Sequence, residues 1–521
     1  MNTKKIFHPA LLFGGIAALA LLGFRQLVRA GYGPVPATPS NEDQAYAELD
    51  GYIEQQMRRL NIPGASLAVV GGDRIVHLRG FGRVRPGGGA PTPQTPFFIG
   101  SLTKSFTALA IMQLVEEGKV ELDAPVQRYL PWFRVADPQA SAQGDQRAQI
   151  TVRHLLNQTS GLPQLPGMAG LANFDNRPGA LERQVRALSG LELKPPVGSQ
   201  FEYSNLNYNV LGLIVEAASG ERYADYTQKH IFDPLQMHHS YVSKEVAEQN
   251  GLAAGYRLWF GFPIPVRNLP VQAGSLPSGE LISTAEDMAH YLIAQLNAGC
   301  YRDQQIVSGA GLDEMHQGAA EIKEMGMALG SYGMGWTSQV TGKSRIVSHT
   351  GDVPNFAAFM AIIPEQKKGM VLLLNANNAM LKMTLDEMGQ GAAERLAGEV
   401  PSPTLFDVTP WIMRGLLLIP ALQLVDIAAT LRRLHRWRRD PQSRLRRGPW
   451  MRYILLPLVP NLLAALTLVP MLSELRSFLT VFSPDFSWIA RISGSFAIVW
   501  SFLRTYLFLG SMSERRPGAQ P

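Results

Sequence analysis

The stretch Phe97-Phe98-Ile99-Gly100-Ser101-Leu102-Thr103-Lys104-Ser105-Phe106 decides how the rest of the chain is interpreted. Mostly apolar residues follow from Ala108 to Val115, and Gly118 offers a stop, so the stretch opens a predicted buried helix. Ser101 would lie in its first turn, where free backbone N–H groups and the helix dipole favour negative charge. Lys104 follows one turn later on the same face and can accept the hydroxyl proton if burial lowers its pKa. This is the arrangement of an activated serine nucleophile, although an exposed pair on a helix is the ordinary explanation of such spacing.

A second stretch, Phe201-Glu202-Tyr203-Ser204-Asn205, carries groups suited to the same chemistry. It lies on a predicted loop between a Gly- and Pro-rich region and a predicted buried helix at Asn207 to Ala218. A tyrosine beside a lysine ammonium can move protons between a nucleophile and a leaving group. The asparagine two residues later can hydrogen-bond a substrate amide. Taken alone, Tyr203 would be interpreted as a packed aromatic residue.

The third stretch is Ser348-His349-Thr350-Gly351-Asp352, placed just after a predicted strand at Ile346 to Val347. The glycine would let a ligand approach the backbone closely, and donors on the strand would bind a substrate as an added strand. A backbone N–H just past Gly351 can join that of Ser101 as an oxyanion hole. In isolation, His349 would be interpreted as a structural histidine.

In this order and separation, the three stretches resemble the serine β-lactamase and penicillin-binding-protein family, whose signature is S-x-x-K, S-D-N and K-T-G. The chain is most similar to the branch of class C β-lactamases, D-amino-acid peptidases and esterases, where the middle motif is Tyr-x-Asn. The resemblance covers roughly residues 44–398. It implies that Ser101 is the acylated nucleophile, Lys104 its base or the base's partner, and Tyr203 the proton shuttle. The substrate-binding residues that it implies are Asn205, His349, Thr350, Gly351 and Asp352, with the backbone N–H groups of Ser101 and Asp352 as the oxyanion hole.

Two departures from the family pattern bear on the substrate. His349 stands where many relatives carry lysine, which removes a permanent cation that would hold a substrate carboxylate. This argues against a strong β-lactamase or carboxypeptidase and suits esterases and aminopeptidase-like relatives. Gln158 replaces a histidine often seen before Thr-Ser-Gly-Leu-Pro, with an effect that the sequence leaves open. The region from Gly274 to Asp287, where substrate side-chain contacts are expected, looks generic.

The order of the predicted elements indicates an α+β fold. Predicted strands lie near the start of the globular part, at 65–70 and 74–80, and again near its end, at 346–347, 357–363 and 370–375. A short helix capped by Thr151 and the buried helices lie between them. We therefore expect a β-lactamase/transpeptidase-like fold, with one antiparallel sheet from both chain ends and a helical subdomain, followed by an all-α transmembrane region.

The composition excludes several classes of site. The single cysteine, Cys300, rules out an internal disulfide framework and a thiolate metal cluster, and the ten histidines are scattered. We expect no metal and no organic cofactor. The net charge of +6 comes from the two ends of the chain, whereas the middle is acidic, so the basic residues indicate membrane topology and not nucleic-acid binding.

The two ends of the chain also set the predicted domain organisation. Residues 1–31 are expected to form a signal peptide or N-terminal anchor, 32–43 a linker, 44–400 the hydrolase domain and 401–410 a second linker. Three apolar stretches at 411–431, 453–472 and 486–509 are each long enough to span a bilayer, within a region 411–510 that precedes a tail at 511–521. The arginine-rich loop after the first span places that loop and the tail in the cytoplasm and the hydrolase domain outside. Asp426, inside the first span, is expected to pair with Arg432 or Arg433.

These observations predict a protein of the bacterial inner membrane whose serine hydrolase domain faces the periplasm or the cell exterior. Its partners would be the lipid bilayer and a small-molecule or peptide substrate, an amide or ester, with D-amino-acid peptides as one candidate class. An exported domain with three spans is also similar to the prodrug-activating peptidases of natural-product assembly. The alternatives are a β-lactamase or esterase of the same family, or a β-lactam or cell-wall sensor that stays acylated. A catalytically dead scaffold would predict a broken motif, and none of the three motifs is broken.

Overall fold

The computed structural model describes residues 42–136, 149–164, 175–267, 271–324, 327–402, 408–439 and 476–513. The predicted N-terminal segment at 1–31, the predicted second span at 453–472 and most of the predicted tail lie outside these residues. The first of two compact units, Met1–Ala47, is described only from the start of helix α2 (Glu42–Leu60). All that follows concerns the second unit, Glu48–Pro521.

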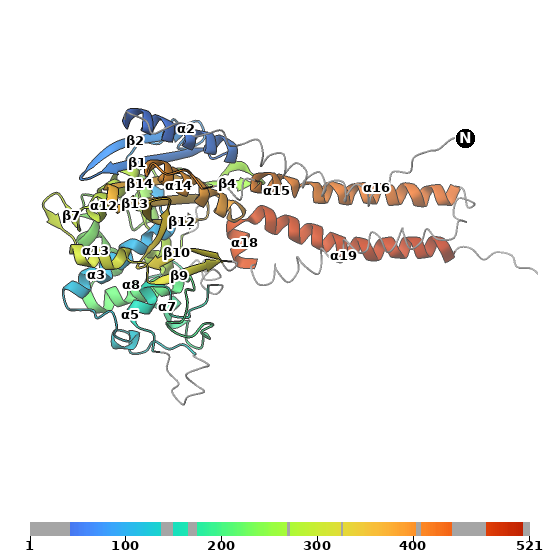
Figure 1. Ribbon diagram of the computed structural model, residues 1–521. Coiled ribbons are helices and arrows are strands. Elements are labelled where there is room, and N and C mark those ends of the chain that lie inside the picture. Colours follow the sequence, from blue (N-terminus) through green and yellow to red (C-terminus); the bar gives the residue numbers. More distant parts are fainter. Residues whose placement is uncertain are drawn as a thin grey trace, which may run out of the picture. The chain divides into compact units, whose positions relative to one another are not determined.

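An eight-stranded antiparallel sheet lies at the centre of this unit, in the order β2-β1-β14-β13-β12-β11-β10-β9 (Figure 1). Because β1 pairs with β14, with Ala65 opposite Leu374, the sheet joins both ends of the domain as predicted. The sheet strands are β1 (Gly64–Gly71), β2 (Arg74–Gly82), β9 (Ala320–Glu324), β10 (Met327–Gly333), β11 (Trp336–Thr341), β12 (Ser344–Val353), β13 (Phe356–Ile363) and β14 (Lys368–Leu374). β12 extends through His349 and Asp352, so the third motif lies within a strand and not after one.

The helices form the rest of the domain, and the shorter strands lie in small sheets beside them. The helices are α3 (Thr103–Glu116), α5 (Val152–Leu156), α7 (Ala180–Arg186), α8 (Asn205–Ser219), α9 (Tyr223–Thr227), α10 (Lys244–Gln249), α11 (Leu276–Gly279), α12 (Ala285–Leu296), α13 (Gly309–His316) and α14 (Lys382–Leu396). The short strands are β3 (Phe97–Phe98), β4 (Tyr256–Trp259), β5 (Phe262–Pro265), β6 (Ile282–Ser283), β7 (Cys300–Tyr301), β8 (Gln304–Gln305) and β15 (Ala376–Asn377).

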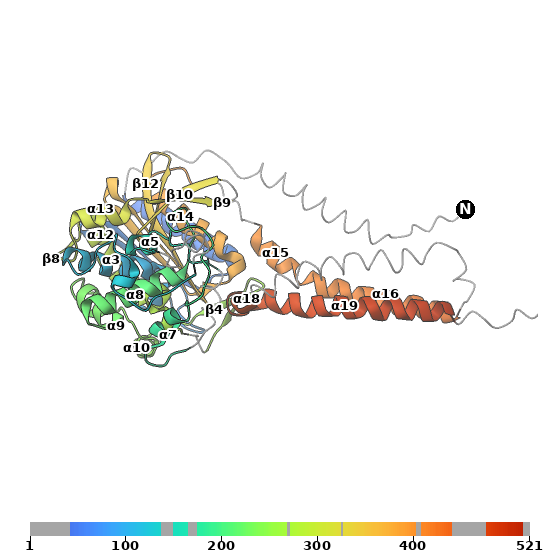
Figure 2. The same ribbon diagram turned by 90° about the horizontal axis from the view of Figure 1, so that it is seen from below.

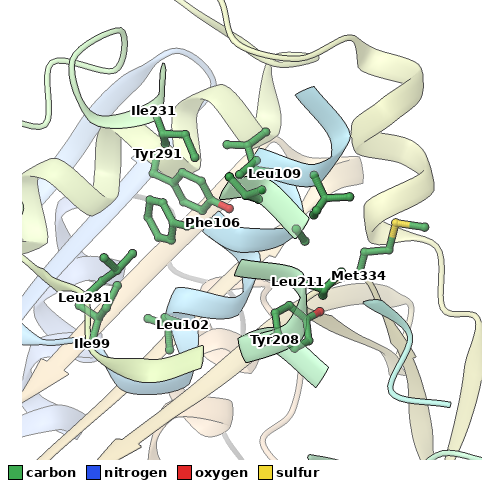
Figure 3. Close-up of a cluster of buried hydrophobic side chains, with 14 of the residues drawn as sticks. Ile99, Leu102, Phe106, Leu109, Tyr208, Leu211, Ile231, Leu281, Tyr291 and Met334 are labelled. Carbon is green, nitrogen blue, oxygen red and sulfur yellow. The ribbon is translucent and has the colours of Figure 1, made fainter. Parts of the chain in front are cut away.

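The Ser101 segment runs through the middle of the core. Figure 3 shows Leu102, Phe106 and Leu109 among side chains from α8 and α12, with the Phe106 ring stacked 4.0 Å from that of Tyr291. These residues are fully buried, and each such apolar side chain contributes about 1.5–3 kcal/mol relative to its exposure. Packing on every side therefore fixes the backbone that carries Ser101.

The predicted helix boundaries hold where a capping signal marks them. Thr151 caps α5 by accepting a hydrogen bond from the backbone N–H of His154, and Gly220, with φ of +76°, ends α8. The start of the Ser101 helix differs from the prediction. Ser101 lies in a single 3₁₀ turn, Gly100–Leu102, directly before the α-helix.

The C-terminal part contains α15 (Thr409–Gly415), α16 (Leu418–Arg439), α18 (Arg476–Phe482) and α19 (Pro484–Ser513). Two stretches, Thr409–Arg439 and Pro484–Gly510, are long and apolar enough to cross a membrane. α16 and α19 run alongside each other (Figures 1 and 2). Asp426 accepts hydrogen bonds from Arg504 and from the Trp500 indole, each at 2.8 Å. The predicted pairing with Arg432 or Arg433 is therefore wrong, because the neighbouring helix offers a buried partner that local spacing does not reveal.

Candidate active site

Lys104 lies at the centre of the site and is completely buried. Its Nζ lies 2.7 Å from Asn205 Oδ1, 2.7 Å from the carbonyl oxygen of Ser278 and 3.0 Å from Ser101 Oγ. The first two partners can only accept hydrogen bonds from Nζ, which uses both N–H groups of a neutral amine. The third partner is a hydroxyl, toward which the nitrogen lone pair is then directed. Burial lowers the pKa of Lys104 well below its ordinary value, against the opposing charge of Asp352, so the geometry and the charge balance both suit a base.

The backbone beside Ser101 approaches β12 closely. Gly100 has a φ of +55°, and a Cβ at this position would lie 2.5 Å from the backbone nitrogen of Asp352. A Cβ at Gly351 would likewise lie 2.1 Å from the carbonyl oxygen of Ile99. Only glycine fits such a contact, so the two glycines let the Ser101 turn and the end of β12 meet. The backbone N–H groups of Ser101 and Asp352 belong to the two segments that meet there.

Tyr203 precedes α8 and places its ring 4.9 Å from Lys104 Nζ. Burial raises the pKa of the Tyr203 phenol, while a hydrogen bond with Ser101 and the charge of Lys382 oppose the increase. The phenol therefore stays protonated at neutral pH and can donate a proton. Asn205, the first residue of α8, points its amide oxygen at Lys104, so one predicted substrate contact also orients the lysine.

Gln158 holds the Tyr203 loop in place, which answers the question that the sequence left open. Its backbone has a φ of +58°, and its carbonyl oxygen accepts a hydrogen bond from the backbone N–H of Glu202 at 2.8 Å. Its buried side-chain oxygen accepts from the backbone N–H of Ser204 at 2.9 Å and from the Asn207 amide. The sequence showed that Gln158 departs from the family pattern, but only these hydrogen bonds show what the residue does in the structure.

His349 is buried and neutral. Its Nδ1 lies 2.6 Å from the carbonyl oxygen of Thr350, so Nδ1 carries the proton and Nε2 accepts from the Tyr332 hydroxyl at 3.2 Å. Burial lowers the pKa of His349 to about 3. The position that carries a cation in many relatives therefore carries no charge here.

A lysine that sequence reasoning missed lies beside β12. Lys382, the first residue of α14, places Nζ 3.0 Å from Asp352 Oδ2 and 2.5 Å from Asp386 Oδ2. Burial alone would lower the pKa of Lys382, but the two carboxylates outweigh it and raise the pKa. Asn377 also donates to Asp352 at 3.1 Å. The i, i+4 spacing of Lys382 and Asp386 is visible in the sequence, whereas their approach to Asp352 is not.

The predicted residues line one pocket of about 580 Å³. Those that contribute to its wall are Ser101, Tyr203, Asn205, His349, Thr350 and Asp352. Gly351 lies between the last two on β12, and Lys104 lies behind the wall. The fold thus brings together all the residues that the three motifs predicted.

A second recess of about 30 Å³ adjoins Ser101, and we call it the 280 recess. Its wall includes Ser278 and Glu280 from the segment 274–287, which the sequence made look generic. The segment therefore contributes to the wall beside Ser101, and Ser278 also binds Lys104 through its carbonyl oxygen. The full lining is Ser101, Asn205, Gln272, Ser275, Ser278, Gly279, Glu280, Asp352, Val353, Pro354 and Phe482.

Phe478 and Phe482 of α18 also line the large pocket, and their rings stack 4.7 Å apart. The turn between α18 and α19 is held by buried polar contacts. Asp485 accepts hydrogen bonds from the backbone N–H of Phe260 at 2.8 Å and from the Asn378 amide at 3.1 Å. Ser483 donates to Asn378 at 2.8 Å. A segment next to a candidate membrane span therefore forms part of the pocket wall.

No group of three or more His, Cys, Asp or Glu side chains within the described ranges could hold a metal ion. The chemistry that the arrangement itself supplies is a serine hydroxyl, a base, a proton donor and a pair of backbone N–H groups.

Comparison with known proteins gives the same assignment as the geometry. A model of the Beta-lactamase family matches residues 49–393. Protein flp of Staphylococcus aureus (strain MW2) is 29% identical over 353 residues, covering 66% of this chain and 65% of that protein. The chain thus spans somewhat less than two thirds of the length of this relative.

Solved structures share the fold. The octameric penicillin-binding protein homologue from Pyrococcus abyssi is 29% identical with a TM-score of 0.57, covering 69% of this chain and 79% of its own. D-amino acid amidase from Ochrobactrum anthropi SV3, solved with D-phenylalanine, is 24% identical with a TM-score of 0.56, covering 68% of this chain and 100% of its own. With the family match extending over residues 49–393 and the three motifs gathered at one pocket, the chain belongs to the Beta-lactamase family.

Proposed function

We propose that the chain is a serine hydrolase that cleaves amides or esters through an acyl-enzyme on Ser101. The observation that carries the proposal is the buried Lys104 Nζ, 3.0 Å from Ser101 Oγ and bound on its other sides to two acceptors. The neutral amine takes the hydroxyl proton as Oγ attacks the substrate carbonyl. The N–H groups of Ser101 and Asp352 stabilise the developing oxyanion.

Tyr203 passes the proton onward in this proposal. Its phenol lies against Lys104 and Ser101, and burial keeps it protonated, so it can deliver a proton to the leaving group and regain it from Lys104. In the second half-reaction water enters, and the same groups activate it. This complete set of base, donor and oxyanion hole favours turnover over a sensor that stays acylated.

The substrate class follows from the charges around Ser101. His349 is neutral, and Lys382 is held between two carboxylates, so the pocket has no uncommitted cation among the described lining residues for a substrate carboxylate. Aminoacyl or peptidyl amides and esters without a terminal carboxylate suit this site better than carboxypeptidase substrates. D-Aminoacyl peptides are the class we propose to test first, with β-lactams as slow substrates.

We further propose that residues 44–400 form the hydrolase domain outside the cytoplasmic membrane, on the periplasmic or exterior side of a bacterial inner membrane. Two apolar helices of sufficient length, Thr409–Arg439 and Pro484–Gly510, support the anchor. The arginine-rich segment after the first of them supports the orientation.

Time-resolved labelling tests the proposed nucleophile. The full-length protein and a Ser101→Ala variant are solubilised and treated with a fluorophosphonate and with a penicillin, and their intact masses are followed. We expect the fluorophosphonate adduct on the wild type alone, and a penicillin adduct that decays or never forms while an ester or a D-aminoacyl amide is hydrolysed. Equal labelling of both proteins would exclude Ser101. A lasting penicillin adduct without turnover of any substrate would favour the sensor.

A further inference from the structure

The 280 recess contains a carboxyl group for which the proposed mechanism has no use. Glu280 directly follows α11, and its side chain has no hydrogen bond or ion pair with any residue of the described ranges. It lies in the wall of the recess that also includes Ser101 and Asn205. Desolvation in the recess raises the pKa of Glu280 to about 8.

The charges nearby determine what such a group can bind. The second carboxylate of the recess, Asp352, is already engaged by Lys382 and Asn377. The lysine nearest Ser101, Lys104, is buried with a lowered pKa, and its Nζ is already engaged by Ser101, Asn205 and Ser278. A substrate anion would therefore meet a carboxyl group and no free cation within the described wall of the recess. A substrate cation would instead find a half-buried carboxyl group that can lose its proton and pair with it.

The recess is small, with a volume of about 30 Å³ against about 580 Å³ for the large pocket. It therefore suits a small polar group such as an ammonium better than the bulk of a substrate. Gln272 and Ser275 also line the recess and carry side-chain oxygen atoms, a kind of atom that can accept hydrogen bonds from an ammonium.

We propose that Glu280 is a specificity-determining residue that binds the free ammonium group of an aminoacyl substrate in the 280 recess while Ser101 attacks its carbonyl. This inference rests on the proposed function and names its substrate class: aminoacyl amides or esters with an unblocked amine. The α-amine lies one carbon from the scissile carbonyl, which agrees with a recess that adjoins the nucleophile.

Matched substrates and matched variants test the proposal. Alanyl p-nitroanilides of D and L configuration, each with a free amine and as the N-acetyl derivative, are compared on full-length wild type, Glu280→Gln and Glu365→Gln. Glu365 pairs with Arg345 on an exposed turn away from the pocket and serves as the control. The four compounds are also measured as competitors that slow fluorophosphonate labelling of Ser101, which gives a result even for compounds that turn over slowly.

We expect the wild type to prefer the free amines, and Glu280→Gln to lose about tenfold or more in kcat/KM or in protection for them, as for a close charge pair in a binding site. The N-acetyl compounds should change by about twofold at most, and Glu365→Gln should match the wild type. Equal losses on both substrate forms would make Glu280 structural and overturn the proposal. So would a wild type that does not prefer the free amine, a result that needs no variant to fold.

The labelling reaction separates this proposal from the one on which it rests. If the fluorophosphonate fails to label Ser101 of the wild type, the proposed function itself is wrong. If Ser101 is labelled in both the wild type and Glu280→Gln while free and acetylated amines behave alike, only the assignment of Glu280 is wrong.

Discussion

Removing the Asp485 carboxylate should release the α18–α19 turn from the hydrolase domain. Asp485 is buried and accepts one hydrogen bond from the Phe260 backbone N–H and one from the Asn378 amide. A hydrogen bond to a charged group contributes a net stabilisation of about 1.5–3 kcal/mol. Asp485→Ala loses both hydrogen bonds, and with them about 3–6 kcal/mol of the free energy that holds the turn. Water that enters the site can bind the freed donors and so restores part of this stabilisation. We take about 3 kcal/mol as the expected loss.

Asp485→Asn provides a graded comparison. The asparagine side chain keeps one oxygen but has an NH₂ group in place of the other. That NH₂ group would face one of the two N–H donors that bind the carboxylate in the wild type. Asn378 cannot turn its amide around without cost, because its oxygen already accepts from Ser483 and from the backbone N–H of Met380. The asparagine variant should therefore lose about half as much, about 1.5 kcal/mol, since one of the two hydrogen bonds remains.

Hydrogen exchange at the Phe260 amide measures this loss directly, because that N–H is itself the donor to Asp485. A loss of about 3 kcal/mol corresponds to a roughly 150-fold faster opening, at about 1.4 kcal/mol per tenfold. We expect this increase in Asp485→Ala and an increase of roughly tenfold in Asp485→Asn. Amides of β13 within the sheet should keep their protection, and Asp303→Ala, at an exposed turn, should exchange like the wild type. Unchanged exchange at Phe260 in Asp485→Ala would refute the reasoning.

The remaining predictions concern the pocket. Lys104→Met should slow fluorophosphonate acylation by about 10²–10⁴-fold in stopped-flow labelling. Lys104→Arg should not restore the rate, because a guanidinium stays protonated. Rapid acylation of either variant would exclude the role of Lys104 as the base. Because burial lowers the pKa of Lys104, acylation by an uncharged ester should fall as pH drops through a midpoint below the ordinary lysine value of 10.5, and a midpoint at 10.5 would contradict this. Gly100→Ala places a Cβ 2.5 Å from the Asp352 nitrogen and should reduce labelling about 10²-fold or more with unchanged circular dichroism; full labelling would disprove the close approach. Gln158→Ala leaves the buried N–H donors of Ser204 and Asn207 without their acceptor. Each unpaired donor should lower the free energy of unfolding by about 1–3 kcal/mol, measured as a lower Tm. An unchanged Tm would show that water replaces the side chain.

The sequence alone predicted much of the fold because the relevant signals are local. Thr151 caps its helix, and Gly220 ends another, because a side-chain oxygen and a left-handed backbone act within one turn. Runs of alternating or continuous apolar residues predicted the strands that now join both ends of the domain. Ser101 and Lys104 face each other because one helical turn separates them.

Only the tertiary structure decided the contacts that depend on residues far apart in the chain. Lys104 is turned toward Ser101 by Asn205 and Ser278, which are 101 and 174 residues away. Glu280 gives no sequence signal, since a glutamate after a short helix is ordinary until a recess beside the nucleophile surrounds it. Asp426 pairs with Arg504, 78 residues away, and not with Arg432 or Arg433, about two turns along its own helix. Helical and strand periodicity determine which face a residue occupies. The register and packing of distant segments determine which partner it meets there, and no local pattern specifies that partner.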